Sequence, residues 1–323
     1  TKVITQTKFG ESSVLSFGEA PLAPLGDIHL LVRNVAAGVN PGDYKVRLYR
    51  SILPIPSFAV GWDAAGSVEF VGSAVPGFAV GDEVFYSRDI TKSGTNAEKT
   101  VVDSRTVARK PKSLTFAEAF IIPLAALTAQ ESFMKVLGVH AGKTIPIYNG
   151  SGGVGSLAIQ HAKHLGLTVV GTSSRPETVE WVKSLGADEV INHREDILPQ
   201  LESIGIKPNY VLELRDNARI REPIKPLAPF ACLSWPTTTE DLATIDSTDM
   251  FFGRKSMGYE LMFCCPSTGV DPERQCKILE NVAALLDEGK LRHTLKEAIP
   301  WTRVGEAHSM VEKCTVIENI ALA

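Results

Sequence analysis

Three glycines, Gly150, Gly152 and Gly155, form a G-x-G-x-x-G pattern within the stretch "IPIYNGSGGVGSLAIQ". The residues before the pattern predict a strand and those after it predict a helix, which is the context that gives the pattern meaning. Glycines let the backbone approach a pyrophosphate, whose charge is favoured by the N–H groups at a helix N-terminus. We therefore expect dinucleotide contacts from the whole turn, although a tight turn that binds nothing would carry the same glycines; its residues are Gly150, Ser151, Gly152, Gly153, Val154 and Gly155.

The next predicted strand, "LTVVGTS", ends at Ser173, and Ser174 and Arg175 follow it. Sites specific for NAD typically place Asp or Glu there to accept the ribose hydroxyls. Two hydroxyl groups and a guanidinium can instead donate to a 2′-phosphate, which predicts NADP(H) rather than NAD(H). The alternative is that Arg175 is only a solvated residue at the start of the next helix.

The elements that must position these residues change in character near residue 115. Up to that point, segments such as "IHLLVRNVAAGVN", "AAGSVEFVG", "GDEVFYS" and "EKTVVDSRTVARK" predict short strands of a small all-β domain. After Gly142, predicted strands and helices alternate, which favours a parallel sheet covered by helices on both faces. Between them, "SLTFAEAFIIPLAALTAQESFMKVLGV" predicts a helix that Pro123 breaks or kinks.

Composition excludes several classes of protein. The chain has 323 residues, 22% of them charged, and a formal net charge of −4, so we expect no nucleic-acid partner. It contains no run of about 18 apolar residues, so we expect no membrane span. Its five cysteines, an odd number confined to the last third of the chain, favour a reducing compartment such as the cytoplasm.

The chain resembles the medium-chain dehydrogenase/reductase superfamily, in particular its zinc-free quinone oxidoreductase and enoyl reductase branch, whose members include zinc-type alcohol dehydrogenase-like proteins. The segments that carry the resemblance are "NPGDYKVR", "GWDAAGSVEFVG", "GTNAEK", "IIPLAALTAQE", "NGSGGVGSLAIQ" and "SRPETVEWVKSLGADEVINH". The resemblance implies an α/β protein with a GroES-like β domain and a Rossmann domain built on a doubly wound parallel sheet. We expect the first domain at residues 1–117 and 266–323, and the second, which binds NADP(H), at residues 118–265.

The resemblance also implies that no zinc is bound. Zinc-dependent relatives have Cys where this chain has Asn40, and a His-Glu pair where it has Trp62 and Asp63. Zinc needs Cys, His or carboxylate donors in a tetrahedral array, which Asp63 alone cannot supply. Without zinc to acidify an alcohol, hydride delivery to a polarised C=C bond is the easier reaction, because the developing enolate needs only hydrogen-bond donors.

By their place in the family, residues of "NPGDYKVRLYR" line the substrate cleft, which we expect between the domains. We predict Asn40, Tyr44 and Lys45 as the donors, with Tyr49 as a nearby alternative. Lys45 and Arg47 could instead form a solvated helix or strand face, and for Asp43 a turn-capping role is the expectation.

Further cofactor contacts also follow from the resemblance; they are Thr128, His193, Leu214, Leu233, Ser234 and Phe263. Departures from the family's usual residues leave the substrate open; they are Lys99, Glu213, Arg215, Cys264 and Cys314. A carboxylate at Glu213 beside the cofactor would be costly unless paired, and we expect a partly exposed ion pair with Arg215.

Three functions therefore remain open: an NADPH-dependent reductase of enones or quinones, a biosynthetic trans-acting enoyl or tailoring reductase of a polyketide- or alkaloid-like substrate, and a crystallin-like NADPH-binding protein without turnover. Relatives are commonly dimers that extend the Rossmann sheet edge to edge, so we also expect a homodimer, with "FACLSW" and the following segment supplying that edge.

Overall fold

The computed structural model describes residues 1–48, 58–215, 224–235, 245–313 and 319–322. It divides into two compact units. Unit 1 comprises Thr1–Leu127 and Phe263–Ala323, and unit 2 comprises Thr128–Met262. Tyr49 and Cys314 lie outside the described residues.

Unit 1 is built on a seven-stranded sheet. Its strands lie in the order β15 (Leu295–Ile299), β16 (Asn319–Leu322), β3 (His29–Gly38), β5 (Asp63–Val71), β6 (Glu83–Ser87) and β8 (Val107–Arg109), and β7 (Lys99–Asp103) also pairs with β3. The pairs within β3, β5, β6, β7 and β8 are antiparallel. A second sheet contains β2 (Leu15–Glu19), β1 (Lys2–Gln6) and β4 (Phe58–Ala59).

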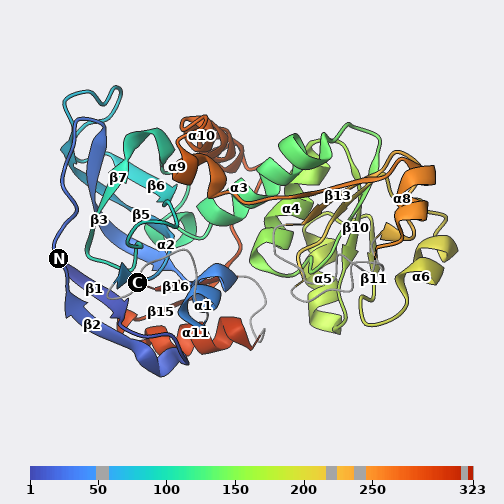
Figure 1. Ribbon diagram of the computed structural model, residues 1–323, viewed down its shortest axis with the longest axis horizontal. Helices are drawn as coiled ribbons and strands as arrows, with labels where there is room; N and C mark the ends of the chain where they lie inside the picture. The colour runs from blue at the N-terminus through green and yellow to red at the C-terminus, as the bar shows by residue number, and fades with distance from the viewer. Residues whose placement is uncertain (49–57, 216–223, 236–244, 314–318, 323) are drawn as a thin grey trace. The chain divides into compact units, whose positions relative to one another are not determined.

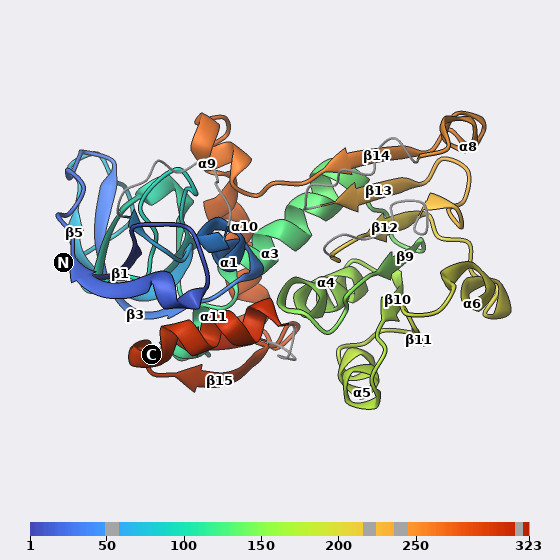
Figure 2. The ribbon, with the colours of Figure 1, turned by 60° about the horizontal axis from the view of Figure 1, so that its bottom comes forward.

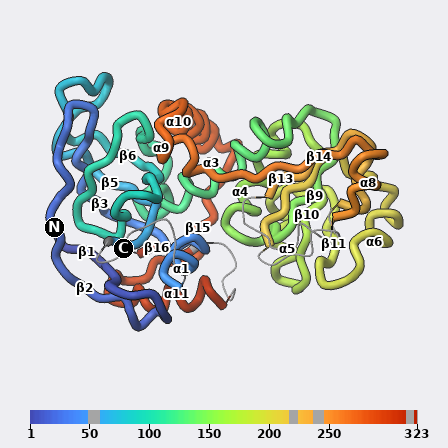
Figure 3. Tube along the Cα trace, in the orientation of Figure 1, coloured from blue at the N-terminus to red at the C-terminus, as the bar shows by residue number. Residues whose placement is uncertain are grey.

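The C-terminal segment returns to the N-terminal part of unit 1, as Figure 1 shows for β15 and β16. Helix α11 (Val304–Glu312) runs beside α1 (Pro41–Leu48) (Figure 3). The buried Arg47 guanidinium of α1 forms an ion pair of 2.5 Å with Glu312 of α11. The described part of unit 1 also contains α2 (Phe116–Ala119), the first residues of α3 (Pro123–Glu131), α9 (Cys264–Thr268) and α10 (Arg274–Asp287), with 3-10 turns at Ser12–Val14, Ser104–Thr106 and Trp301–Arg303.

Unit 2 contains a six-stranded parallel sheet (Figure 2). Its strands lie in the order β11 (Glu189–Ile191), β10 (Thr168–Thr172), β9 (Thr144–Ile147), β12 (Tyr210–Leu212), β13 (Cys232–Trp235) and β14 (Ser256–Tyr259). Counted from the first strand of the unit, this is the 3-2-1-4-5-6 order of the doubly wound fold. The crevice outside the carboxyl ends of such strands, at the point where the order reverses, is where these folds bind ligands.

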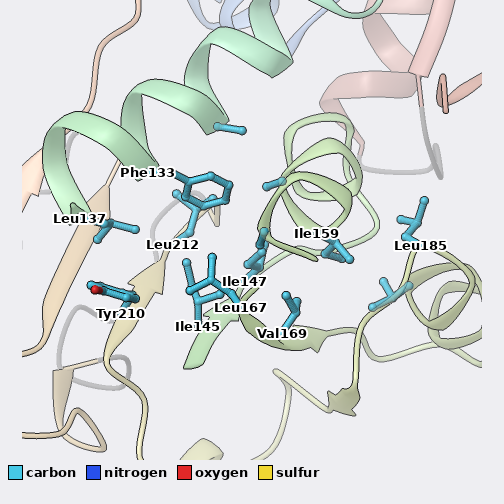
Figure 4. Packing of buried hydrophobic residues seen from close by; sticks show 14 residues of the cluster. Phe133, Leu137, Ile145, Ile147, Ile159, Leu167, Val169, Leu185, Tyr210 and Leu212 are labelled. Atoms are coloured by element: carbon cyan, nitrogen blue, oxygen red, sulfur yellow. The ribbon is translucent and has the colours of Figure 1, made fainter. Parts of the chain in front are cut away.

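Two hydrophobic cores cover the two faces of this sheet, because side chains alternate along each strand. Val169 and Leu212 point into one core and their neighbours Val170 and Val211 into the other. Figure 4 shows the first core, to which helices α4 (Gly153–His164) and α5 (Pro176–Ser184) contribute. The second core includes residues of α6 (Ile197–Ser203) and a contact from α8 (Ser247–Gly253).

The helical run Phe116–Leu137 is long and apolar enough to cross a membrane by length and composition, but 78% of its apolar window is buried within the protein. Such burial is the pattern of a core helix. Pro123 does interrupt the run as expected: α2 ends at Ala119, and α3 (Pro123–Glu131) begins at the proline and passes into the π-helix η3 (Ser132–Leu137).

Most of the expected helices and strands form, and one predicted strand segment is divided in two. The segment "EKTVVDSRTVARK" gives two strands, β7 and β8, because a 3-10 turn separates them. The Asp103 carboxylate caps this turn by accepting from the Arg105 backbone N–H at 3.0 Å. The segment "FACLSW" gives β13, which lies one position inside the sheet, and the edge strand is β14.

Candidate functional site

The glycine pattern forms the turn between β9 and α4 in unit 2. Asn149 opens the turn with a φ of +53°, a conformation that asparagine tolerates better than most residues. The Gly150 N–H donates to the Thr172 carbonyl at 3.2 Å, and the Gly152 N–H donates to the Asn149 carbonyl at 3.0 Å. Helix α4 then begins at Gly153, so its first-turn N–H groups lie at the carboxyl end of β9.

Gly155 is the glycine that this turn needs most. A Cβ atom there would lie 2.3 Å from the Asn149 carbonyl oxygen and 2.8 Å from the Gly150 Cα, both of them backbone atoms. At Gly150 the nearest atoms to a Cβ would be side-chain atoms, Ile159 Cδ1 at 3.1 Å and Val182 Cγ2 at 3.3 Å. The turn is therefore closely packed backbone at a helix N-terminus, and its residues fit a pyrophosphate.

The end of β10 carries the residues that distinguish the two nicotinamide dinucleotides. Ser173 is buried, and its hydroxyl donates to the Thr178 hydroxyl within α5. Ser174 is half-buried. The Arg175 side chain is 39% exposed and its guanidinium forms a loose ion pair of 3.3 Å with Glu177, so it can reorient toward a phosphate at little cost.

A second polar group occupies the ends of β9, β11 and β12. The His193 Nδ1 and the Thr172 hydroxyl are 3.2 Å apart, and burial lowers the pKa of His193, with the charges of Arg215 and Arg194 adding to the effect. The Arg215 guanidinium lies 4.3 Å from the centroid of the Tyr148 ring. The sequence predicted His193 here, but not the stack of Arg215 on Tyr148, for which it offered no signal beyond the two residue types.

Glu213 and Arg215 form the expected ion pair, with Nη2 donating to Oε2 at 2.8 Å and Nε donating to Oε1 at 3.0 Å. The pairing is confirmed. The pair is more buried on its acidic side than expected, since the Glu213 side chain is 0% exposed and that of Arg215 is 18% exposed. Glu213 follows β12, whose neighbours in the sheet exclude water from that position.

The remaining residues expected at the cofactor lie in both units. In unit 2, Thr128 and Leu233 are buried, Leu214 packs partly buried against the first core, and the buried Ser234 hydroxyl donates to the Ser132 hydroxyl at 3.0 Å. Phe263 is buried and belongs to unit 1, where it precedes α9. The side chains of these residues are therefore used mainly in packing. Any contact of Leu233 or Ser234 with a nucleotide would come from their backbone atoms or from neighbouring residues.

In unit 1, α1 carries the expected substrate donors. Asn40 is buried immediately before the helix, and Tyr44 and Lys45 are half-buried within it. Asp43 occupies the first turn, where its carboxylate accepts the Asn40 N–H at 2.5 Å. Asp43 thus caps the helix as the sequence predicted.

Asp63, considered from the sequence only as an isolated zinc donor, is at the centre of a hydrogen-bonded cluster. Its Oδ2 accepts from the Asn40 amide nitrogen at 2.9 Å, and its Oδ1 accepts from the Leu124 N–H at 2.9 Å. Asp43 and Asp63 are both 0% exposed. Burial raises the pKa of Asp43 to about 7 and raises the pKa of Asp63 well above its ordinary value, with the nearby Asp43 carboxyl contributing to the latter shift.

Within the described ranges, the side chains around Asp63 do not form a metal centre. There, no three His, Cys, Asp or Glu side chains come together in a way that could hold a metal ion. The position beside Asp63 is Trp62, which is fully buried and offers no ligand atom of the kind zinc takes.

Two other departures from the family's usual residues, Lys99 and Cys264, belong to unit 1. Lys99 forms an ion pair of 2.8 Å with Glu69, which also pairs with Arg33. Cys264 is exposed at the start of α9.

Two family models match the chain. The alcohol dehydrogenase GroES-like domain matches residues 26–123, and the zinc-binding dehydrogenase family matches residues 153–264. A curated relative, a zinc-type alcohol dehydrogenase-like protein of Staphylococcus aureus (strain COL), is 33% identical over 307 residues, covering 91% of this chain and 90% of the relative. An NADPH-dependent alkenal/one oxidoreductase of Arabidopsis thaliana is 36% identical over 68% of this chain and 61% of its own length.

Solved structures show the same fold. One from Rhizobium etli CFN 42, whose name places it among zinc-dependent alcohol dehydrogenases, has 36% identity and a TM-score of 0.92, covering 99% of this chain and 97% of the other. The quinone oxidoreductase of Coxiella burnetii has 27% identity and a TM-score of 0.85, covering 99% and 98% of the two chains. With a GroES-like domain, a Rossmann domain and relatives of this similarity over nearly its full length, the chain belongs to the medium-chain dehydrogenase/reductase family.

Proposed function

We propose that the protein is an NADPH-dependent reductase that acts, without zinc, on a C=C bond conjugated to a carbonyl or on a quinone. The observation that carries the proposal is the end of β10, where Ser174 and the partly exposed Arg175 lie in place of a ribose-binding acid. The relative that acts on alkenals and alkenones with NADPH supports the same cofactor and substrate class.

The residues of unit 2 would hold the cofactor. The N–H groups at the start of α4 would bind the pyrophosphate, and Arg175 would pair with the 2′-phosphate. Bound NADPH supplies the hydride. Asn40, Tyr44 and Lys45 of unit 1 would donate hydrogen bonds to the substrate oxygen, which gains negative charge as hydride reaches the β-carbon. The α-carbon then takes a proton from water, so that one hydride and one proton are added in all.

Zinc independence is part of the proposal. It rests on the residues around Asp63, where the two acids Asp43 and Asp63 and the Asn40 amide lie together and no His or Cys joins them among the described residues, and on the weaker demand that conjugate reduction makes for a Lewis acid. Metal analysis of the purified protein tests it, because a stoichiometric content of zinc that survives dialysis and is needed for turnover would contradict it.

The first experiment follows NADPH absorbance with a panel of enones, enals and quinones, and repeats it with NADH. We expect turnover with NADPH and at least one panel member. A protein that binds NADPH tightly but consumes none would be a nucleotide-binding protein without turnover.

The second experiment compares Arg175→Ala with Lys183→Ala, which removes an exposed cation from the same helix α5. Loss of the phosphate partner should weaken NADPH binding about tenfold or more, with NADH binding unchanged. Lys183→Ala should change neither. Equal losses for both dinucleotides in Arg175→Ala would show that Arg175 does not recognise the 2′-phosphate.

A further inference from the structure

The cluster around Asp63 joins three segments of unit 1 that are far apart in the sequence. The Asp63 carboxylate accepts one N–H from the Asn40 amide and another from the backbone of Leu124, each at 2.9 Å. Its own carbonyl accepts the Thr95 hydroxyl at 2.7 Å. The residue before α1, the start of β5 and the first turn of α3 are thus tied at one side chain.

Asn40 is held at two points by two acids. Its backbone N–H donates to Asp43 at 2.5 Å, and its side-chain nitrogen donates to Asp63 at 2.9 Å. An amide group is planar, so one hydrogen bond from its nitrogen sets the direction of its second N–H and of its oxygen. The orientation of the Asn40 amide is therefore determined by the Asp63 carboxylate.

This arrangement is expensive to maintain. Asp43 and Asp63 are both without solvent exposure, and burying a carboxyl group costs several kcal/mol unless partners compensate it. The groups that face Asp63 are Asp43 on α1, the Asn40 amide, the Leu124 N–H on α3, the Thr95 hydroxyl and the Ser87 hydroxyl on β6. All but Asp43 are neutral, and Asp43 opposes a charge on Asp63. A purely structural link could be made with less cost by apolar packing.

We propose that Asp63 is a positioning residue: by holding the Asn40 amide and the first turn of α3 in register, it sets the orientation in which Asn40 meets the substrate oxygen. The proposal rests on the proposed function, in which Asn40 is a donor to that oxygen. It assigns Asp63 an effect on the rate of reduction and none on the affinity for NADPH.

The test substitution is Asp63→Asn. The Asn40 amide and the Leu124 N–H donate to different oxygens of Asp63, and asparagine replaces one of these oxygens by an NH2 group that would face a donor. Since small misplacements of a reacting group can cost about 100-fold in rate, we expect kcat to fall about 10- to 100-fold while the Kd for NADPH stays unchanged. The matched control is Thr95→Val, which removes a hydrogen bond to the Asp63 backbone and leaves its carboxylate in place; its kcat should stay near that of the wild type.

A double-mutant cycle separates positioning from general damage. If Asp63 acts through Asn40, Asp63→Asn should lower kcat no further in an Asn40→Ala background. The proposal would be overturned if the two substitutions lowered kcat independently, so that their effects multiply in the double variant. It would also be overturned if Asp63→Asn left kcat unchanged.

Asn40→Asp provides a second variant should Asp63→Asn fail to fold. Two facing carboxyl groups must share a proton to form a hydrogen bond, so kcat of this variant should fall as pH rises, with the wild type as the reference. A pH profile that follows the wild type would count against the proposal.

One further measurement does not depend on activity. The side-chain NH2 signal of Asn40, assigned by its loss in Asn40→Ala, should shift in the NMR spectrum of Asp63→Asn and not in that of Thr95→Val. If the wild type reduces no panel member yet this shift is seen, the proposed function fails and the orienting contact stands; if the signal does not move, the inference fails whatever the activity.

Discussion

Glu213 in unit 2 and Asp63 in unit 1 are both acids with 0% exposure, and their partners differ. Glu213 is paired with Arg215, two residues along the chain, by two charged hydrogen bonds. Asp63 is bound by neutral donors that lie 23 and 61 residues away in sequence. A carboxylate with a cation beside it stays ionised, whereas one bound only by neutral groups at a buried position is pushed toward its protonated form.

The comparison extends to how each region is built. The glycine turn, Arg175 and the Glu213–Arg215 pair are formed by residues close in sequence, whereas the Asp63 cluster exists only because β5, α1 and α3 meet.

Arg215→Met should destabilise the protein by about 3–5 kcal/mol, because it removes the cation from a fully buried carboxylate, and with it the guanidinium that lies over the Tyr148 ring, while keeping an unbranched apolar side chain. Urea unfolding measures the change. The double variant Glu213→Leu/Arg215→Met should recover most of the loss, since it also removes the charge that needs a partner. If the double variant is as unstable as the single one, the loss comes from packing and the contrast with Asp63 does not hold.

Gly155→Ala should cost about 1–3 kcal/mol of unfolding free energy, because the added Cβ would meet two backbone atoms of the turn, the nearer at 2.3 Å. NADPH binding, followed by cofactor fluorescence, should weaken with it. Gly42→Ala in α1 is the matched control, since a Cβ there meets nothing within 4 Å. Equal behaviour of the two variants would mean that the turn can move to admit a side chain.

Local sequence therefore predicted the turn and the ion pair well. The G-x-G-x-x-G pattern predicted a glycine turn between a strand and a helix, and Glu213 with Arg215 needed only their own spacing; the close approach of two backbone segments at Gly155 came from the structure. The role of Asp63 could not be read in this way, because its partners Asn40 and Leu124 come next to it only in the folded unit. The one available signal was an acid at the start of an otherwise apolar strand in "GWDAAG". The division of one predicted segment into β7 and β8 has a local cause instead, because the Asp103 carboxylate accepts the Arg105 N–H two residues along and caps a 3-10 turn there.

Asp43→Asn should change the pH dependence of stability in unit 1. Folded Asp43 keeps its proton to about pH 7, whereas the unfolded residue loses it near its ordinary pKa of 3.8. Between these values the folded state binds more protons than the unfolded state, so the wild type loses stability as pH rises, by at most about 1.4 kcal/mol per pH unit.

The measurement is the difference in unfolding free energy between wild type and Asp43→Asn at several pH values from 4 to 8. Taking the difference removes the contribution of His308, whose pKa burial lowers to about 3 and which acts in the opposite direction below pH 6.5. The unfolding free energy of the wild type should fall relative to that of Asp43→Asn as pH rises to about 7. Above that pH the difference between the two should stay constant. A difference that is constant with pH would show that Asp43 is ionised in the folded protein throughout, as a paired acid would be.

Lys99→Ala should have the smallest effect on the unfolding free energy. It measures how much a cation paired with a carboxylate contributes to stability where water reaches both groups. Lys99 pairs with Glu69 at 2.8 Å, and both side chains are 27% exposed; Arg33, which is 47% exposed, pairs with the same carboxylate. Water screens such pairs, so we expect a loss below about 1 kcal/mol in low salt and almost none in 1 M NaCl. Measured beside Arg215→Met, it compares a single partly exposed cation–carboxylate contact of 2.8 Å with a pair of the same shortest distance that is buried and joined by two hydrogen bonds. If the two losses were similar, burial would not be what makes the Glu213 pair matter, and the distinction drawn between Glu213 and Asp63 would lose its physical basis.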